Sequence, residues 1–172
     1  MAGDSMLLVY TGKGKGKTSA SVGQAVRAYG QGMAVAFGQF MKRPGQAGEQ
    51  EVLAELLGER FHAGGKGFFR NEESRAEHRQ SALDLLVWAE KQLPGLDMLI
   101  LDESLYALGL DILHEKELRD IIDKAMEHQV HLVLSGRGLP AWLRDRADLV
   151  TEMEEIKHPY AEGKKAVRGI EF

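Results

Sequence analysis

Short, wholly apolar runs alternate with longer segments of helical periodicity along this chain. A run without polar residues is typical of a parallel strand that is covered on both faces. In the longer segments, apolar residues recur three or four positions apart, as on one face of a helix. The alternation predicts an α/β fold in which one sheet of five or six mostly parallel strands carries helices on both faces.

The same pattern predicts where the individual elements lie. Strands are expected at 6–10, 33–37, 60–62, 96–101, 130–134 and 148–153, and the tail from 157 is expected to form a turn and a closing strand. Helices are expected from the end of the first loop to Gly30, and around 49–57, 71–93, 118–125 and 140–146. No repeat or linker is seen, so we expect one domain over residues 1–172, with Met1 to Ser5 as a flexible leader.

The segment TGKGKGKTS at 11–19 follows the first strand and precedes a helix. A strand, a glycine-rich loop and a helix N-terminus form a phosphate site, because backbone N–H groups and the helix dipole face the anion. The lysines add positive charge, and the threonine supplies a hydroxyl where a P-loop holds Mg²⁺. The predicted phosphate site comprises Gly12, Lys13, Gly14, Lys15, Gly16, Lys17, Thr18 and Ser19.

This loop is one residue shorter than the common Walker pattern. That pattern has a glycine at the position of Thr11, whereas the nearest glycine here is Gly12. A glycine-rich hairpin turn is the alternative interpretation. It does not explain why Lys17 and Thr18 lead directly into a helix, so we favour the phosphate loop.

A pair of acids ends the strand expected at 96–101. An apolar strand that closes with Asp102 and Glu103 is typical of a Walker B motif, whose carboxylates hold Mg²⁺ directly or through water. The alternative is that the acids only cap the next helix. The strand at 130–134 ends in a glycine-flanked Arg137, whose guanidinium can reach a phosphate or form a surface ion pair.

Composition and charge limit the classes of partner and of chemistry that are expected for this chain. The net charge is −4, which argues against nucleic acid or an anionic membrane as the main partner. The chain has no cysteine, which excludes thiolate catalysis, disulfides and cysteine metal sites. No apolar run reaches about 18 residues and no secretory signal pattern is seen, so a cytoplasmic location is expected. Histidines and acids show no metal-ligand spacing. His158 is the histidine singled out as a candidate, and the alternative is a structural role, which is more common for a lone histidine.

Six segments together resemble the ATP:corrinoid adenosyltransferases of the cobalamin pathway, the P-loop (CobA/BtuR-like) family. They are TGKGKGKT at 11–18, QFMK at 39–42, LDE at 101–103, SGRG at 135–138, ADLVTEM at 147–153 and KHPY at 157–160. The resemblance runs from about residue 6 to the C-terminus. The short loop is that family's own form of the P-loop.

The resemblance implies a RecA-like P-loop domain, usually a homodimer, that binds Mg-ATP and a reduced corrinoid such as cob(I)alamin. In this family the Co(I) centre attacks the 5′ carbon of ATP, a cobalt–carbon bond forms as in adenosylcobalamin, and triphosphate leaves. The triphosphate is thought to lie in the loop in reverse sense, with its γ-phosphate where other P-loop enzymes hold inner phosphates. A reductase is expected to supply the Co(I) state.

The resemblance also implies roles for single residues. Arg27, on the helix that follows the loop, matches a family arginine near the nucleotide. The expected catalytic groups are Lys15, Lys17, Glu103 and Arg137, and the expected Mg²⁺ ligands are Thr18, Glu103 and Asp102.

The corrinoid side is expected around Phe68. Gly67-Phe68 resembles the family's Gly-Phe-x-Trp segment, whose aromatic residues help displace the lower ligand of cobalt; Arg70 stands where some members have Trp. The alternative is that Phe68 and Phe69 are buried in the core. Many members also carry an N-terminal helix over the corrinoid site, whereas the first strand here is expected to begin at residue 6.

Two other functions stay open at this point. The loop and the two acids alone are also consistent with a P-loop phosphohydrolase or kinase, which would cleave the γ-phosphate without any corrinoid. The arginine at position 70 and the missing N-terminal helix are consistent with a non-catalytic carrier that binds ATP and a corrinoid.

Overall fold

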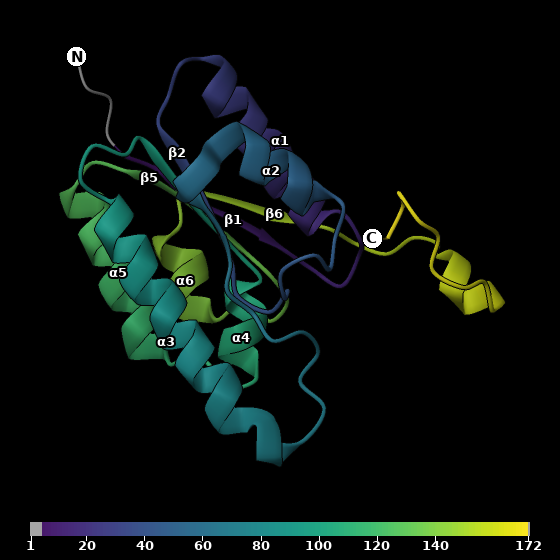
Figure 1. The fold of residues 1–172 in the computed structure, drawn as a ribbon. Helices are drawn as coiled ribbons and strands as arrows, with labels where there is room; N and C mark the ends of the chain where they lie inside the picture. Colours follow the sequence, from purple (N-terminus) through teal and green to yellow (C-terminus); the bar gives the residue numbers. More distant parts are fainter. Residues whose placement is uncertain (1–4, 172) are drawn as a thin grey trace.

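The computed structural model describes residues 5–171, so most of the leader expected at Met1 to Ser5 lies outside the described residues. Six strands form one sheet in the order β3-β2-β4-β5-β1-β6, and every neighbouring pair is parallel (Figure 1). The strands are β1 (Leu7–Thr11), β2 (Val35–Gln39), β3 (Phe61–Ala63), β4 (Met98–Asp102), β5 (His131–Ser135) and β6 (Leu149–Glu152). The expected α/β fold with a parallel sheet is confirmed.

Helices cover both faces of this sheet (Figure 1). One layer consists of α1 (Lys17–Gly30) and α2 (Glu49–Leu57). The opposite layer contains α3 (Arg75–Gln92), α4 (Ser104–Gly109), α5 (Glu115–Glu127) and α6 (Ala141–Arg146). Short 3₁₀ turns lie at Gly58–Arg60, Glu72–Ser74 and Pro159–Glu162.

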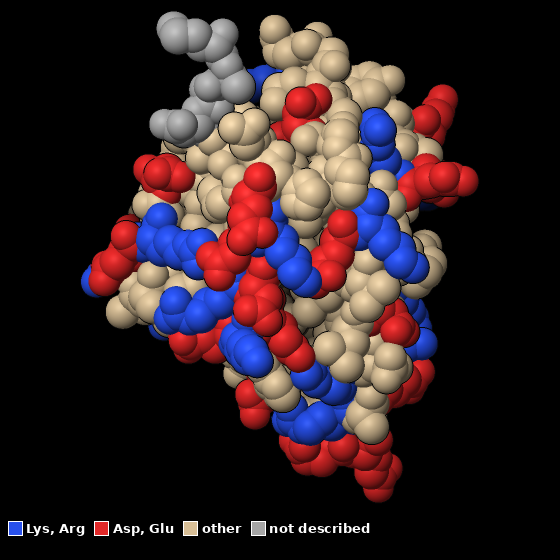
Figure 2. All heavy atoms as spheres, turned by 90° about the vertical axis from the view of Figure 1, so that its left-hand side faces the viewer, with Lys and Arg blue, Asp and Glu red and all other residues tan. Residues whose placement is uncertain are grey.

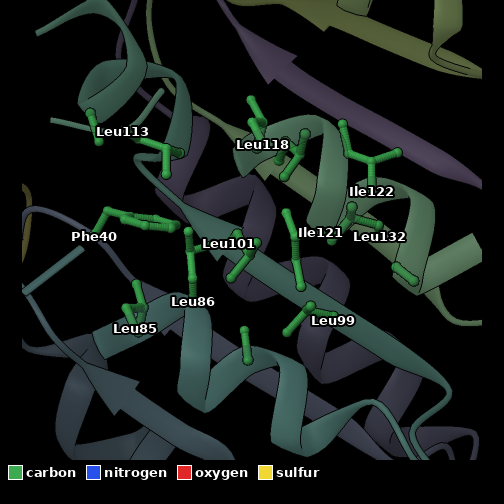
Figure 3. Close-up of a cluster of buried hydrophobic side chains, with 14 of the residues drawn as sticks. Phe40, Leu85, Leu86, Leu99, Leu101, Leu113, Leu118, Ile121, Ile122 and Leu132 are labelled. Carbon is green, nitrogen blue, oxygen red and sulfur yellow. The ribbon is translucent and has the colours of Figure 1, made fainter. Parts of the chain in front are cut away.

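Successive residues of a strand belong to different hydrophobic clusters. Leu99 and Leu101 of β4 belong to the cluster that contains α3 and α5, and Figure 3 shows Leu101 between Leu86 of α3 and Ile121 of α5. Ile100, between them in the sequence, packs instead with the α1 and α2 layer. Both faces of the strand are therefore buried, which is why it reads as a continuous apolar run rather than an alternating one.

The strand order decides what meets at the carboxyl edge of the sheet. β5 lies between β1, which leads into the glycine-rich loop, and β4, which ends in Asp102. Tyr10 of β1 pairs with Ser135 at the end of β5, and Leu101 pairs with Leu134. The three strands end level with one another, so the residues that follow them meet at this edge.

Two elements differ from the sequence prediction. Helix α4 was not expected; it begins directly after Glu103, whose left-handed backbone (φ 61°) turns the chain sharply out of β4. The expected closing strand in the tail is wrong for the residues that the structure describes. Gly169, at φ 79°, allows a turn in which the N–H groups of Ile170 and Glu171 both donate to the Val167 carbonyl, so these groups bond locally rather than to the sheet. Phe172 lies outside the described residues.

The surface carries charges of both signs. Figure 2 shows acidic and basic side chains interspersed on the face at the left of Figure 1. Lys124 of α5 pairs with Glu90 of α3, and Arg146 of α6 pairs with Asp123 of α5. Among residues 5–171, none of the helices combines the length and the apolar character that a membrane span requires.

Candidate functional site

The loop between β1 and α1 rests on the chain that follows β6. The Gly14 N–H donates to the Met153 carbonyl at 2.8 Å. At Gly12, where φ is 105°, an added Cβ would lie 2.2 Å from the same carbonyl oxygen. Only glycine fits this close approach of two backbones at this φ value. The distant segment after β6 therefore fixes the curve of the loop.

Lys17, the first residue of α1, points its side chain back into the loop and bridges two of its carbonyl groups. Its Nζ donates to the carbonyls of Gly12 (2.8 Å) and Gly14 (2.6 Å). Burial lowers the pKa of this ammonium and the nearby Arg137 adds to the effect, whereas Asp102 and Glu103 oppose it. Positive charge thus stands at the centre of the loop, where an anion would be neutralised.

Asp102 is fully buried at the end of β4 and accepts hydrogen bonds from three different elements. Thr18 Oγ1 donates at 3.1 Å, Ser135 Oγ at 2.6 Å and Gln39 Nε2 at 3.2 Å. The donors come from α1, β5 and β2, so this carboxylate ties the loop helix to the ends of two other strands. A buried carboxylate needs such donors to offset its lost hydration.

Glu103 lies next to this cluster but its carboxylate is not satisfied. Its N–H donates to Ser135 Oγ at 3.0 Å, while its Oε2 is buried and has no hydrogen-bond partner. Burial, with the charge of Asp102 as the second cause, raises the pKa of Glu103 to about 7. A buried carboxylate oxygen without a donor is suited to a cation.

The oxygens of Thr18, Asp102 and Glu103 fit Mg²⁺, which prefers a few protein oxygens together with substrate phosphates. Within residues 5–171, no group of three or more histidines or acids could hold a metal ion by itself. A metal at this position would therefore need further ligands from a bound phosphate.

Lys42 also belongs to this cluster, although no role was predicted for it. It follows β2, and its Nζ donates to Glu49 Oε1 at 2.8 Å and to Thr18 Oγ1 at 3.2 Å, and lies 3.5 Å from Asp102 Oδ2. Burial acts to lower the pKa of Lys42, but Asp102 and Glu49 outweigh it and the pKa is raised. The segment QFMK at 39–42 was the available signal for Lys42; nothing in the sequence pointed to Glu49.

A cavity of about 690 Å³ lies over the loop and is called the loop cavity below. The predicted residues that line it are Lys13, Gly14, Lys15, Gly16, Lys17, Thr18, Ser19, Phe68, Asp102, Glu103 and Arg137. Lys42, Glu49, Tyr106 and Ser135 line it without having been predicted, and His158 also reaches it. An anion that enters this cavity meets lysines from the loop, an arginine from the end of β5 and the first turn of α1.

The family model of ATP:corrinoid adenosyltransferases, described as BtuR/CobO/CobP, matches residues 4–172. This chain belongs to that family. A corrinoid adenosyltransferase of Sinorhizobium is 37% identical over 173 residues, which cover 97% of this chain and 80% of the relative. The corrinoid adenosyltransferase CobA of Salmonella typhimurium is 34% identical over 169 residues, covering 97% of this chain and 85% of the relative.

A solved structure supports the fold. The flagellar accessory protein FlaH from Methanocaldococcus jannaschii superposes with a TM-score of 0.55 at 11% identity, covering 87% of this chain and 70% of that chain. At this identity the likeness concerns the fold alone. Family membership identifies the protein as an enzyme that transfers an adenosyl group from ATP to a corrinoid, and its P-loop fold is that expected for an ATP site.

Two predicted residues of this adenosyltransferase lie outside the loop cavity. Gly12 lies beneath the loop, against Met153, and does not line the cavity. Arg27 is exposed in the last turn of α1 and is not among the lining residues. Its role near the nucleotide stays a prediction.

Phe68 and Phe69 differ sharply in their surroundings. Phe68 is 71% exposed and lines both the loop cavity and a second cavity of about 880 Å³, called the adjoining cavity below. Phe69 packs against the core, with its ring edge-to-face on His78 at 5.5 Å and under Arg75 at 4.8 Å. The alternative that both rings are buried is therefore wrong for Phe68. Arg70 lines the adjoining cavity.

Proposed function

We propose that the enzyme transfers the 5′-deoxyadenosyl group of Mg-ATP to the Co(I) centre of a corrinoid, with triphosphate as the second product. One observation carries the proposal: the loop cavity and the larger adjoining cavity share their lining residues Lys42, Phe68, Glu103, Tyr106 and Glu171. A polyphosphate in the first cavity would therefore have its sugar end next to a second space that is open to another substrate.

The proposed reaction does not require a protein acid or base. The electron pair of Co(I) forms the new bond to the 5′ carbon, and the bond from that carbon to the phosphate oxygen breaks with its electrons going to triphosphate. No proton moves in this step. The protein has to hold the two substrates in line and neutralise the charge that develops on the leaving group.

The loop cavity contains the groups for this neutralisation. Backbone N–H groups of the loop, the Lys15 and Lys17 ammonium groups and Arg137 would surround the triphosphate. Thr18, Glu103 and Asp102 would hold Mg²⁺, whose charge assists departure of the polyphosphate. The triphosphate is proposed to lie in reverse sense, because the 5′ carbon must stay outside the loop and face the adjoining cavity.

The adjoining cavity is the proposed corrinoid site. Phe68 is aromatic, exposed and located at the boundary of the two cavities, which suits a role in displacing the lower ligand of cobalt. Loss of that ligand gives four-coordinate cobalt, which is easier to reduce. We further propose that a reductase supplies the electron and that the enzyme is a homodimer, which sedimentation measurements would test.

The deciding experiment mixes the protein with Mg-ATP and chemically reduced cobalamin. We expect adenosylcobalamin and triphosphate in equal amounts. The visible spectrum measures the first product, and phosphate chromatography measures the second. A parallel reaction without corrinoid should leave ATP intact. If ADP and phosphate appear instead, with or without corrinoid, the enzyme cleaves the γ-phosphate and the proposal is wrong.

A further inference from the structure

The proposed reaction gives Lys42 no task, yet this side chain reaches the centre of the expected metal site. Its side chain is only 17% exposed, and its ammonium group contacts Thr18 and Asp102, two of the expected Mg²⁺ ligands. Its third partner, Glu49 at the start of α2, is not an expected ligand. A cation therefore already lies where the divalent ion is expected.

We propose that the Lys42 ammonium is a built-in cation that excludes free divalent metal from Thr18 and Asp102, and that only a metal–nucleotide complex displaces it. This inference rests on the Mg²⁺ site in the proposed function. It adds an order of events: the metal enters together with the nucleotide, and Lys42 moves from the metal ligands to a phosphate oxygen.

The first argument is geometric. Lys42 Nζ lies 3.2 Å from Thr18 Oγ1. Since Mg²⁺ binds oxygen at roughly 2.1 Å, an ion bound to this hydroxyl would lie within about 5 Å of the ammonium group if neither moved. Two positive ions at this distance repel strongly inside a protein. The hydrogen bond from Lys42 also engages a lone pair of the hydroxyl that a metal could otherwise use.

The second argument is that a fixed acceptor remains for Lys42 when it leaves Asp102. Glu49 Oε1 accepts from Gln39 Nε2 at 3.2 Å as well as from Lys42. Gln39 is itself held by Gln50, whose Nε2 donates to Gln39 Oε1 at 2.8 Å. Glu49 is thereby anchored at the wall of the loop cavity. Lys42 can pivot on it towards a phosphate, which replaces Asp102 as the second anion.

Free metal offers no such replacement, because it takes the Asp102 carboxylate and leaves the largely buried Lys42 ammonium with fewer acceptors. A metal–nucleotide complex brings phosphate oxygens for both cations. The difference predicts weak binding of the metal alone and strong binding of the complex.

The test uses Mn²⁺ without nucleotide, with binding measured by electron paramagnetic resonance and calorimetry. We expect Lys42→Met to bind Mn²⁺ tighter than the wild-type protein by on the order of tenfold or more, because a positive charge beside the site is gone. The control Lys124→Met removes a partly exposed lysine of α5 that pairs with Glu90 of α3 and lines neither cavity, and it should leave the affinity unchanged. The gain should disappear in Lys42→Met/Asp102→Asn. Equal affinity of the wild-type protein and Lys42→Met would overturn the inference.

A second variant separates charge from folding. Lys42→Arg keeps the charge and should bind free Mn²⁺ as weakly as the wild-type protein; tight binding by this variant would also overturn the inference. If Lys42→Met unfolds without metal because Asp102 is left unpaired, Mn²⁺ at millimolar concentration should restore its thermal transition. Failure to restore it, with the wild-type transition unchanged, counts against the inference.

These measurements need no corrinoid, so they are independent of adenosyl transfer. The affinity for Mn-ATP in Asp102→Asn tests the metal site itself. If that affinity is unchanged, the metal ligands of the proposed function are wrong. If it falls while Lys42→Met binds free Mn²⁺ no better than the wild-type protein, only the inference about Lys42 fails.

Discussion

Thr18 Oγ1 lies 3.1 Å from each carboxylate oxygen of Asp102, although 84 residues separate them in the chain. Thr18 lies in α1, which follows β1, and Asp102 ends β4; these two strands are not neighbours, because β5 lies between them. Ser135 at the end of β5 completes the connection by donating to Asp102 at 2.6 Å. The loop helix and the acidic strand end are thus held in one hydrogen-bonded unit, and each part of it can be tested separately.

Gly12→Ala tests the support of the loop. The new Cβ would meet the Met153 carbonyl at 2.2 Å, so the loop or the chain after β6 must shift. We expect a loss of about 1–3 kcal/mol in the free energy of unfolding, as for other overpacked sites, together with weaker ATP binding in calorimetry. Gly23→Ala is the control, since no atom lies within 4 Å of its added Cβ. Equal effects of the two substitutions would mean that the contact with Met153 determines neither the stability of the protein nor its ATP binding.

Ser135→Ala tests the bridge to Asp102. The buried carboxylate loses its shortest hydrogen bond, which should cost about 1–3 kcal/mol of stability. It should also lower kcat/KM, because Asp102 orients Thr18. Ser81→Ala is matched, because that serine is also buried but donates only to the His78 carbonyl within α3. It should leave kcat/KM unchanged, and a similar loss in both variants would contradict a positioning role for Ser135.

Lys17→Ala removes the ammonium at the centre of the loop. The expected cost is on the order of 2–4 kcal/mol in transition-state stabilisation, by analogy with other preorganised electrostatic groups. It should be measured as kcat/KM for ATP at saturating reduced corrinoid. Lys116→Ala, on the exposed side of α5, is the control. Unchanged kcat/KM in Lys17→Ala would show that the triphosphate is stabilised by other groups.

Glu103 makes stability depend on pH. Its pKa is about 7 in the folded enzyme against an ordinary value of 4.5. Between these values the folded state binds more protons than the unfolded state, so this residue's contribution to stability falls as pH rises from 4.5 to 7. Glu103→Gln lacks this pH-dependent contribution. Between pH 4.5 and pH 8 its free energy of unfolding should therefore rise, relative to that of the wild-type enzyme, by on the order of 2–3 kcal/mol.

Urea unfolding at the two pH values measures that difference. Glu127→Gln, an exposed substitution near the end of α5, should show no such change relative to the wild-type enzyme. Mg-ATP should reduce the pH dependence of the wild-type enzyme, because a bound cation favours the charged carboxylate. A parallel pH response of wild type and Glu103→Gln would mean that Glu103 is charged in the folded state throughout this range.

Phe68→Ala tests the corrinoid side. If this exposed ring displaces the lower ligand, the variant should lose more activity with cobalamin, which carries that ligand, than with a corrinoid that lacks one. The ratio of kcat/KM values for the two substrates is the measurement. Tyr160→Ala removes another exposed aromatic ring, 79% accessible and outside both cavities, and should leave the ratio unchanged. Equal losses with both corrinoids in Phe68→Ala would contradict the role in ligand displacement.

The sequence by itself determined the parallel sheet, the glycine-rich loop and the acids at the end of β4. These features are local: apolar runs report strands buried on both faces, and glycines report backbone that other residues cannot adopt. The motifs in their order were also sufficient to indicate the family. Helix α4 and the local turn at Gly169 were missed, because short segments of this kind carry little periodicity.

Only the tertiary structure decided which distant residues share a site. Lys42 and Glu49 joined the hydrogen-bonded cluster around Thr18 and Asp102, and Arg27 was left on the exposed end of α1. Sequence order does not give these outcomes, because they depend on which strands are neighbours and on where each strand ends. The insertion of β5 between β1 and β4 aligned three strand ends, and that alignment brought Thr18, Asp102 and Ser135 within hydrogen-bonding distance.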